Sequence, residues 1–135
     1  MTFTMEILLV EDSHADVRLT KEALKDAGSD AHLTCVPDGE EAMAYLRQQG
    51  CYMQAKRPDV ILLDLNMPKK NGHEVLQEIK AEPTFYDIPI IVLTVSQEEE
   101  DILKALETRM NYYLSKPVSP DRLLAVLNMV NELWH

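Results

Sequence analysis

The chain has 135 residues, with 13 Lys or Arg against 23 Asp or Glu, so its formal net charge at neutral pH is −10. Its length and its 46% apolar and 27% charged residues are typical of one globular domain with a hydrophobic core. The negative charge argues against a nucleic-acid or anionic-membrane partner, because phosphate groups need Lys and Arg to neutralise them. The apolar runs are also much shorter than the roughly 20 residues of a membrane helix.

The amino terminus and the cysteines indicate the compartment. Residues 1–6 contain no basic segment followed by an apolar one, so we expect no signal peptide. Cys35 and Cys51 are too few for a disulfide framework, and reduced thiols are the simplest interpretation. We therefore expect a cytoplasmic protein whose single domain fills residues 1–135.

Short apolar runs alternate with longer amphipathic stretches along the chain. Residues 7–10 predict a first strand, and residues 13–27 predict a helix that stops at Gly28. Residues 31–36, which mix polar and apolar side chains, predict the second strand. Asp38 then begins the second helix, and a mostly polar connector follows it.

The pattern repeats in the second half of the chain. Residues 60–63 are wholly apolar and predict the third strand, and apolar residues over 75–79 indicate the helix after it. Residues 88–93 predict the fourth strand, with a proline near its start, where a strand tolerates one. Ser96 is expected to cap the next helix.

The last two elements complete the topology. Residues 112–114 predict a short fifth strand, and residues 119–121 (Ser-Pro-Asp) begin the last helix. Regular alternation of strands and helices predicts a parallel sheet with helices on both faces. Continuously apolar strands belong in the centre of such a sheet, so the mixed second and short fifth runs belong at its edges. The predicted fold class is α/β, a flavodoxin-like doubly wound (βα)5 domain with strand order 2-1-3-4-5.

Polar side chains follow four of the predicted strands. Glu11 and Asp12 follow the first strand, Asp64 the third and Thr94 the fourth, and Lys116 comes just after the fifth. Ligands of a doubly wound sheet bind beyond these carboxyl ends. Each residue alone is more often an ordinary turn, core or surface residue than a functional one. Their occurrence at four strand ends on the same edge favours a functional site.

Three neighbouring carboxylates repel one another unless a cation is present. Oxygen ligands suit Mg²⁺, and Mn²⁺ or Ca²⁺ are expected substitutes. We expect Asp12 and Asp64 to bind the metal directly, Glu11 to act through water, and Asn66 to supply its backbone carbonyl.

The same aspartate could carry a phosphoryl group. Asp64 lies at a strand end facing outward, which suits a nucleophile that forms an acyl phosphate. Lys116 and the metal would offset charge on the phosphoryl oxygens, and Thr94 would donate a hydrogen bond to another oxygen.

Four segments, in order, cover essentially the whole chain: residues 9–12 (Leu-Val-Glu-Asp), 63–68 (Leu-Asp-Leu-Asn-Met-Pro) with Gly72, 92–94 (Val-Leu-Thr) and 113–117 (Tyr-Leu-Ser-Lys-Pro). Together they resemble the receiver domain of two-component response regulators. The resemblance implies Mg²⁺-dependent phosphotransfer from a histidine kinase, followed by a population shift towards an active surface. It implies a phosphoacceptor that assists its own phosphorylation and dephosphorylation, and not an enzyme.

The resemblance also implies a role for each matching position, and a cis peptide bond between Lys116 and Pro117. The roles are metal binding for Glu11, Asp12, Asp64 and Asn66, phosphoacceptor for Asp64, phosphoryl contact for Thr94 and Lys116, and switch residues for Thr94 and Tyr113.

A narrower similarity concerns residues 11–13 and 15–19, the Arg57-Pro58 pair, residues 64–76 and Trp134. These segments are similar to the small regulators paired with phytochrome-type histidine kinases. The similarity implies phytochrome-type light signalling and a homodimer. Either a dimer interface or the domain's own core could cover the apolar Trp134, and the sequence leaves both open.

The last helix reaches the end of the chain, so we expect no output domain. Output would then pass through protein contacts, with an unknown downstream protein or by dimerisation. Phosphorylation is expected to draw Thr94 inward and Tyr113 after it, which would remodel the surface of the fourth helix, fifth strand and last helix. We expect neither nucleic acid nor a membrane as a partner.

Three other functions are weighed against this one. A haloacid-dehalogenase-like phosphatase needs a second Asp two residues after its nucleophile, where this chain has Asn66. A pseudo-receiver scaffold that is never phosphorylated is opposed by the intact set of Asp12, Asp64, Thr94 and Lys116. A nucleotide or flavin binder needs a glycine-rich phosphate loop, and none follows the first strand.

Three positions depart from the usual family pattern. Val95 follows Thr94 where a small residue is usual, and Met110 and Tyr112 replace small residues before Tyr113. These departures affect what can be expected of the rate at which the phosphoryl group turns over and of the surface that phosphorylation remodels. They do not affect the identity of the expected phosphoacceptor.

Overall fold

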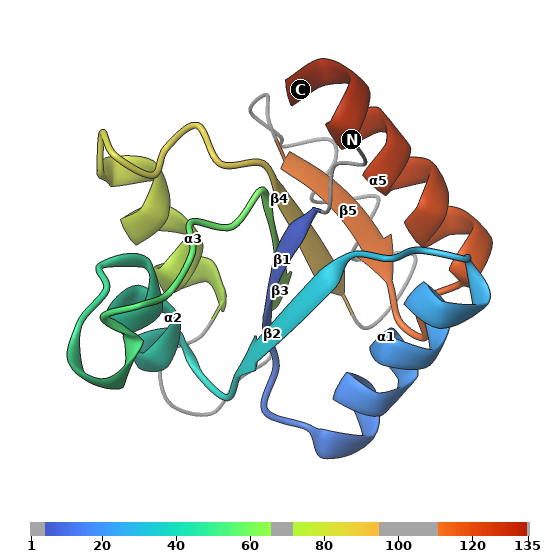
Figure 1. The fold of residues 1–135 in the computed structure, drawn as a ribbon, viewed down its shortest axis with the longest axis horizontal. Helices are drawn as coiled ribbons and strands as arrows, with labels where there is room; N and C mark the ends of the chain where they lie inside the picture. Colours follow the sequence, from blue (N-terminus) through green and yellow to red (C-terminus); the bar gives the residue numbers. More distant parts are fainter. Residues whose placement is uncertain (1–4, 66–71, 95–110, 135) are drawn as a thin grey trace.

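The computed structural model describes residues 5–65, 72–94 and 111–134. Five parallel strands form one sheet in the order β2-β1-β3-β4-β5 (Figure 1), which confirms the predicted fold class and strand order. The strands are β1 (Glu6–Val10), β2 (His32–Val36), β3 (Val60–Asp64), β4 (Ile90–Thr94) and β5 (Asn111–Ser115). The helices are α1 (His14–Asp26), α2 (Gly39–Leu46), the 3₁₀ helix η1 (Gly50–Tyr52), α3 (Gly72–Ala81) and α5 (Pro120–Trp134).

Helices cover both faces of the sheet: α1 and α5 lie on one face, and α2 and α3 lie on the other (Figure 1). Every residue of β3 and β4 is buried, whereas β2 is buried only at Val36. Continuous apolar sequence therefore marks the central strands, because their side chains pack under helices on both faces.

The helix starts follow the predicted capping residues. The Ser13 Oγ accepts a hydrogen bond of 3.2 Å from the backbone N–H of Asp16, and the Asp38 Oδ1 accepts one of 2.9 Å from Glu41. These side chains satisfy backbone donors that the first turn of a helix leaves without a partner. Gly28, with a φ of +74°, follows α1 in the left-handed conformation that glycine adopts at low cost.

Strand bounds differ from the predicted ones by one or two residues, and one predicted helix lies outside the described residues. The fourth strand begins at Ile90 and not at residue 88, although the carbonyl of Pro89 still accepts a hydrogen bond of 3.0 Å from Ile61. Proline has no N–H to donate, so the pairing of β4 with both of its neighbours, β3 and β5, starts at the next residue, Ile90. The helix expected to begin at Ser96 lies outside the described residues.

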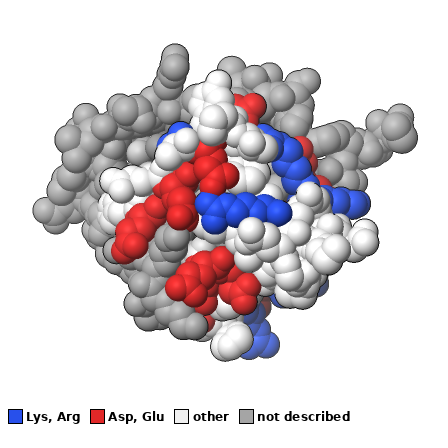
Figure 2. All heavy atoms as spheres, turned by 90° about the vertical axis from the view of Figure 1, so that its left-hand side faces the viewer, with Lys and Arg blue, Asp and Glu red and all other residues white. Residues whose placement is uncertain are grey.

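The surface charge reflects the acidic composition. Asp and Glu side chains gather on the face that α2 and α3 form, with a few Lys and Arg between them (Figure 2). The first turn of α2 contributes two of these acidic residues, Glu40 and Glu41. Among the described helices, none combines the length and the hydrophobicity that crossing a membrane requires.

Candidate functional site

The carboxyl ends of neighbouring strands bring the predicted side chains to one edge of the sheet. Glu11 and Asp12 directly follow β1, Asp64 ends β3, and Thr94 ends β4. Thr94 pairs with Ser115, the residue just before Lys116. Because β1, β3, β4 and β5 are successive neighbours in the sheet, residues distant in sequence meet at this edge.

The ammonium group of Lys116 lies among three carboxylates. Its Nζ donates to Glu11 Oε1 at 2.6 Å and to Asp16 Oδ2 at 3.0 Å, and it is 3.4 Å from Asp64 Oδ2. The backbone N–H of Lys116 also donates to the carbonyl of Thr94 at 2.7 Å, and the bond between Lys116 and Pro117 is cis as predicted. The backbone of Lys116 therefore contacts β4, and its side chain contacts the carboxylates of Glu11, Asp16 and Asp64.

Burial makes the charges at this edge strongly interacting. The exposed fractions of Glu11 and Asp64 are 3% and 1%, whereas Asp12 is exposed. Asp64 is therefore buried at the end of β3 and does not face outward as the sequence suggested. Burial, a hydrogen bond with Asp64 and the charge of Asp64 together raise the pKa of Glu11 to about 7, although Lys116 opposes the change. Burial lowers the pKa of Lys116, but its hydrogen bonds to Glu11 and Asp16 and the charge of Asp64 leave it above its usual value.

The carboxylates of Glu11, Asp12 and Asp64 form a group that could hold a metal ion. One oxygen from each lies within 4.8 Å of the others. Burial is the largest cause of the raised pKa of Glu11, the hydrogen bond with Asp64 and the charge of Asp64 add to it, and Lys116 only partly opposes them. Three oxygen donors with excess negative charge fit a hard divalent cation. The expected fourth ligand, the carbonyl of Asn66, lies outside the described residues.

A glycine makes room for the chain segment that follows Asp64. A Cβ added to Gly72 would lie 2.5 Å from the carbonyl oxygen of Asp64 and 2.5 Å from the Cα of Leu65. The backbone N–H of Gly72 donates to the carbonyl of Leu65 at 3.2 Å. The start of α3 therefore packs directly against the backbone that carries Asp64.

The two predicted switch residues are both buried. Thr94 has no exposed surface, and Tyr113 is 7% exposed. Tyr113 pairs with Val92 across β4 and β5, and both belong to the apolar cluster beneath α2 and α3. The structure thus holds the Tyr113 ring in an inward position.

Some residues singled out in the sequence lie in parts of the chain that the structure does not describe. Val95, Met110 and the side chain of Trp134 fall outside the described residues or side chains. Tyr112 is partly buried and packs against the apolar cluster beneath α1 and α5.

Sequence reasoning missed one member of the site. Ser13 and Asp16 together indicate a helix start in the sequence, but the sequence does not indicate that the Asp16 carboxylate contacts Lys116. The available signal was its spacing, because Asp16 lies four residues after Asp12, in the first turn of the helix that leaves this edge of the sheet.

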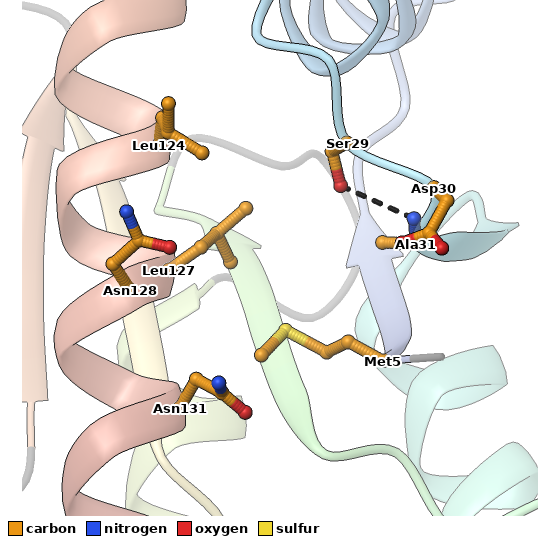
Figure 3. Close-up of a pocket in the computed structure, with 8 residues that line it drawn as sticks. All are labelled: Met5, Ser29, Asp30, Ala31, Leu124, Leu127, Asn128 and Asn131. Atoms are coloured by element: carbon orange, nitrogen blue, oxygen red, sulfur yellow. Dashed lines mark hydrogen bonds between the residues drawn. The ribbon is translucent and has the colours of Figure 1, made fainter. Parts of the chain in front are cut away.

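A separate cavity of about 190 Å³ lies at the opposite end of the sheet. Figure 3 shows Leu124 and Leu127 of α5 on one side of it and the loop before β2 on the other, with Met5 below. In that loop the Ser29 Oγ accepts a hydrogen bond of 3.1 Å from the Ala31 N–H. None of Glu11, Asp12 and Asp64 lines this cavity.

Comparison with known proteins places the fold and the site in a family. The family model of the response regulator receiver domain matches residues 7–128. Response regulator Rcp1 of Synechocystis sp. (strain ATCC 27184 / PCC 6803 / Kazusa) is 47% identical over 128 residues, which are 95% of this chain and 87% of that relative.

Two solved structures extend the likeness to three dimensions. The crystal structure of the phosphorylated cyanobacterial phytochrome response regulator RcpA has a TM-score of 0.77 and 46% identity, covering 98% of this chain and 94% of that one. The crystal structure of the Mn²⁺-bound form of Rcp1 has a TM-score of 0.74 and 46% identity, covering 96% and 94%. The chain therefore belongs to the response regulator receiver domain family, and it is a phosphoacceptor and not a catalytic enzyme.

Proposed function

We propose that this protein receives a phosphoryl group from a histidine kinase on the carboxylate of Asp64, in a reaction that requires Mg²⁺. The observation that carries the proposal is the position of Asp64. This carboxylate is 1% exposed, ends a central strand, belongs to a group of three carboxylates, and lies 3.4 Å from an ammonium. The phosphorylated state of the similar protein RcpA supports the same chemistry here.

The reaction would transfer the phosphoryl group between two nucleophiles. An oxygen of Asp64 attacks phosphorus, the P–N bond to the kinase histidine breaks, and an acyl phosphate forms. Glu11, Asp12 and Asp64, with the carbonyl of Asn66, would hold the cation, which offsets charge on the phosphoryl oxygens when bound. Mn²⁺ and Ca²⁺ are proposed substitutes, and the Mn²⁺-bound form of Rcp1 supports this.

Lys116 and Thr94 would complete the contacts to the phosphoryl group. Lys116 is already within 3.4 Å of the accepting carboxylate and can donate to a phosphoryl oxygen without leaving this edge of the sheet. Thr94 ends β4, the strand next to β3, so its hydroxyl would donate to another phosphoryl oxygen.

The signal would travel through Thr94 and Tyr113 to the protein surface. The Tyr113 ring is buried in this structure, so we propose that phosphorylation favours this inward position over an outward one. Such a shift requires the phosphoryl group to bind one arrangement more tightly than the other. The affected surface would include β5 and α5.

We further propose that residues 1–135 form a single receiver domain, located in the cytoplasm. The acidic surface supports an output through protein contacts and not through nucleic acid (Figure 2). The likeness to Rcp1 and RcpA supports a phytochrome-type histidine kinase as the donor and light signalling as the pathway. A homodimer and an unidentified downstream protein complete the proposed set of partners.

The acceptor can be tested with a phosphohistidine donor that carries a radioactive label. The wild-type chain should gain label when Mg²⁺ is present and lose this ability in EDTA, and Asp64→Asn should gain none. Asp87→Asn, which removes an exposed carboxylate paired with Arg57, serves as the matched control and should be labelled as fast as wild type. Label on Asp64→Asn at the wild-type level would place the acceptor elsewhere, and an unlabelled wild type would support a scaffold that is never phosphorylated.

A further inference from the structure

Asp16 contacts the functional lysine without belonging to the candidate metal group. Its Oδ2 accepts a hydrogen bond of 3.0 Å from Lys116 Nζ. The group of carboxylate oxygens that could hold a metal consists of Glu11, Asp12 and Asp64, and Asp16 is not among them although the structure describes it. Its carboxylate therefore has a different place in the site from the other three.

The backbone of Asp16 is held firmly at the start of α1. Its N–H donates to the Ser13 Oγ at 3.2 Å, and its carbonyl accepts a hydrogen bond of 3.0 Å from the Thr20 Oγ1. Thr20 is 3% exposed, and this second contact is partly buried. A short side chain on a fixed turn of helix presents its carboxylate at a defined position.

Lys116 needs such a partner because its own side chain is long and flexible. A lysine ammonium has three N–H donors on a four-carbon chain with many rotamers. Glu11 accepts from it at 2.6 Å and also accepts a hydrogen bond of 3.3 Å from the Ser13 N–H. Glu11 belongs to the candidate metal group, so a bound cation would share its charge, whereas Asp16 would keep its contact with the lysine.

We propose that Asp16 is a positioning residue, which holds the ammonium of Lys116 within reach of Asp64 and of a phosphoryl group on it. This inference rests on the proposed function and extends it to a residue outside the metal-binding carboxylates. Two of the three ammonium donors point to Glu11 and Asp16, and Asp64 lies beside them at 3.4 Å. The donor now nearest Asp64 can therefore serve a phosphoryl oxygen while Asp16 keeps its own hydrogen bond.

A positioning role and a purely electrostatic role predict opposite results. If Asp16 acted only through its negative charge, its removal would reduce repulsion and tighten the binding of an anionic phosphoryl group. If Asp16 positions Lys116, its removal frees the ammonium to adopt other rotamers and weakens that binding. The sign of the change therefore separates the two roles.

The experiment measures the affinity of the Mg²⁺-loaded protein for beryllium trifluoride, an analogue of the phosphoryl group. We expect Asp16→Ala to weaken this affinity by about 5- to 20-fold, and Asp16→Asn, which keeps an acceptor oxygen, by about 2- to 4-fold. Asp26→Asn removes the same charge from the far end of α1 and should leave the affinity within about twofold of wild type. Tighter or unchanged binding in Asp16→Ala would overturn the proposal.

A second measurement reports on the lysine itself. The ¹⁵N–¹H signal of the Lys116 ammonium should be protected from exchange in the wild type and in Asp16→Asn, and lost in Asp16→Ala. Cooperative thermal unfolding of each variant shows that the fold is intact. Failure of the wild type to bind beryllium trifluoride would count against the proposed function, whereas an unchanged lysine signal in Asp16→Ala would count against the role of Asp16 alone.

Discussion

At the scale of single residues, the site is an unbalanced group of charges. Lys116 Nζ lies within 3.4 Å of Glu11, Asp16 and Asp64, and Asp12 adds a fourth carboxylate nearby. One ammonium cannot neutralise four carboxylates, and the repulsion between Glu11 and Asp64 is stronger because both are buried. The protein can relieve this repulsion by taking up a proton or a metal ion, and burial together with Asp64 raises the pKa of Glu11 to about 7, which favours proton uptake there.

The raised pKa of Glu11 predicts how stability depends on pH when metal is removed. The pKa is 4.5 for an ordinary glutamate and about 7 in the folded protein, so between these values the folded state holds a proton that the unfolded state releases. The free energy of unfolding should therefore fall as pH rises from about 4.5 to 7. Urea unfolding in EDTA at several pH values measures this change.

The matched variant for this prediction is Glu11→Gln. This variant has no carboxyl group at position 11, so its stability should change less with pH over the same interval. Parallel profiles for the wild type and Glu11→Gln would show that another group causes the pH dependence.

At the scale of single elements, the position of Asp64 depends on the contact between β3 and the start of α3. Gly72 begins α3 and lies so close to Asp64 and Leu65 that a side chain there would overlap backbone atoms. Backbone atoms cannot move away by a rotamer change as a flexible side chain can, so β3 and α3 would have to separate. The geometry of Asp64 is thus linked to the first residue of the next helix.

We expect Gly72→Ala to lower the free energy of unfolding by about 2–4 kcal/mol, because the overlap involves two backbone atoms. It should also slow phosphorylation by acetyl phosphate, since the Asp64 backbone must shift. The control is Gly28→Ala, where an added Cβ meets nothing within 4 Å but the φ of +74° is unfavourable. That control should lose about 1 kcal/mol and keep the wild-type rate. Equal losses of stability in the two variants would contradict the packing argument.

At the scale of the whole molecule, the carboxylates of Glu11, Asp12 and Asp64 come together only when the sheet is assembled. Glu11 and Asp12 follow β1 while Asp64 ends β3, 52 positions after Asp12 along the chain. A cation that binds this group binds the folded state in preference to the unfolded chain. Metal binding and global stability should therefore be linked.

Mg²⁺ should accordingly stabilise the protein against unfolding. At a concentration 100 times the dissociation constant, the expected gain is about 2.7 kcal/mol. Asp12→Asn should lose most of this gain, whereas Asp30→Asn, at the opposite end of the sheet, should keep it. Thermal unfolding across a Mg²⁺ titration measures the effect, and a melting temperature that does not respond to Mg²⁺ in the wild type would exclude this site.

The sequence alone was sufficient for the fold class and the strand order, and it indicated the strand ends where the candidate site residues lie. Apolar runs identify buried strands because a strand covered on both faces cannot expose polar groups to water, and Ser13 and Asp38 mark helix starts because their oxygens satisfy free N–H groups. A parallel sheet then places all its strand ends on one edge, which is why Asp64 and Lys116 could be expected to meet.

Only the tertiary structure decided which charged groups share a contact and how deeply they are buried. The hydrogen bond between Asp16 and Lys116, the raised pKa of Glu11 and the overlap that excludes a side chain at Gly72 each depend on distances of a few ångströms between separate elements. Local periodicity determines which face of an element is apolar. It does not determine how closely two elements pack or which rotamer a lysine adopts, because those follow from the packing of the complete fold.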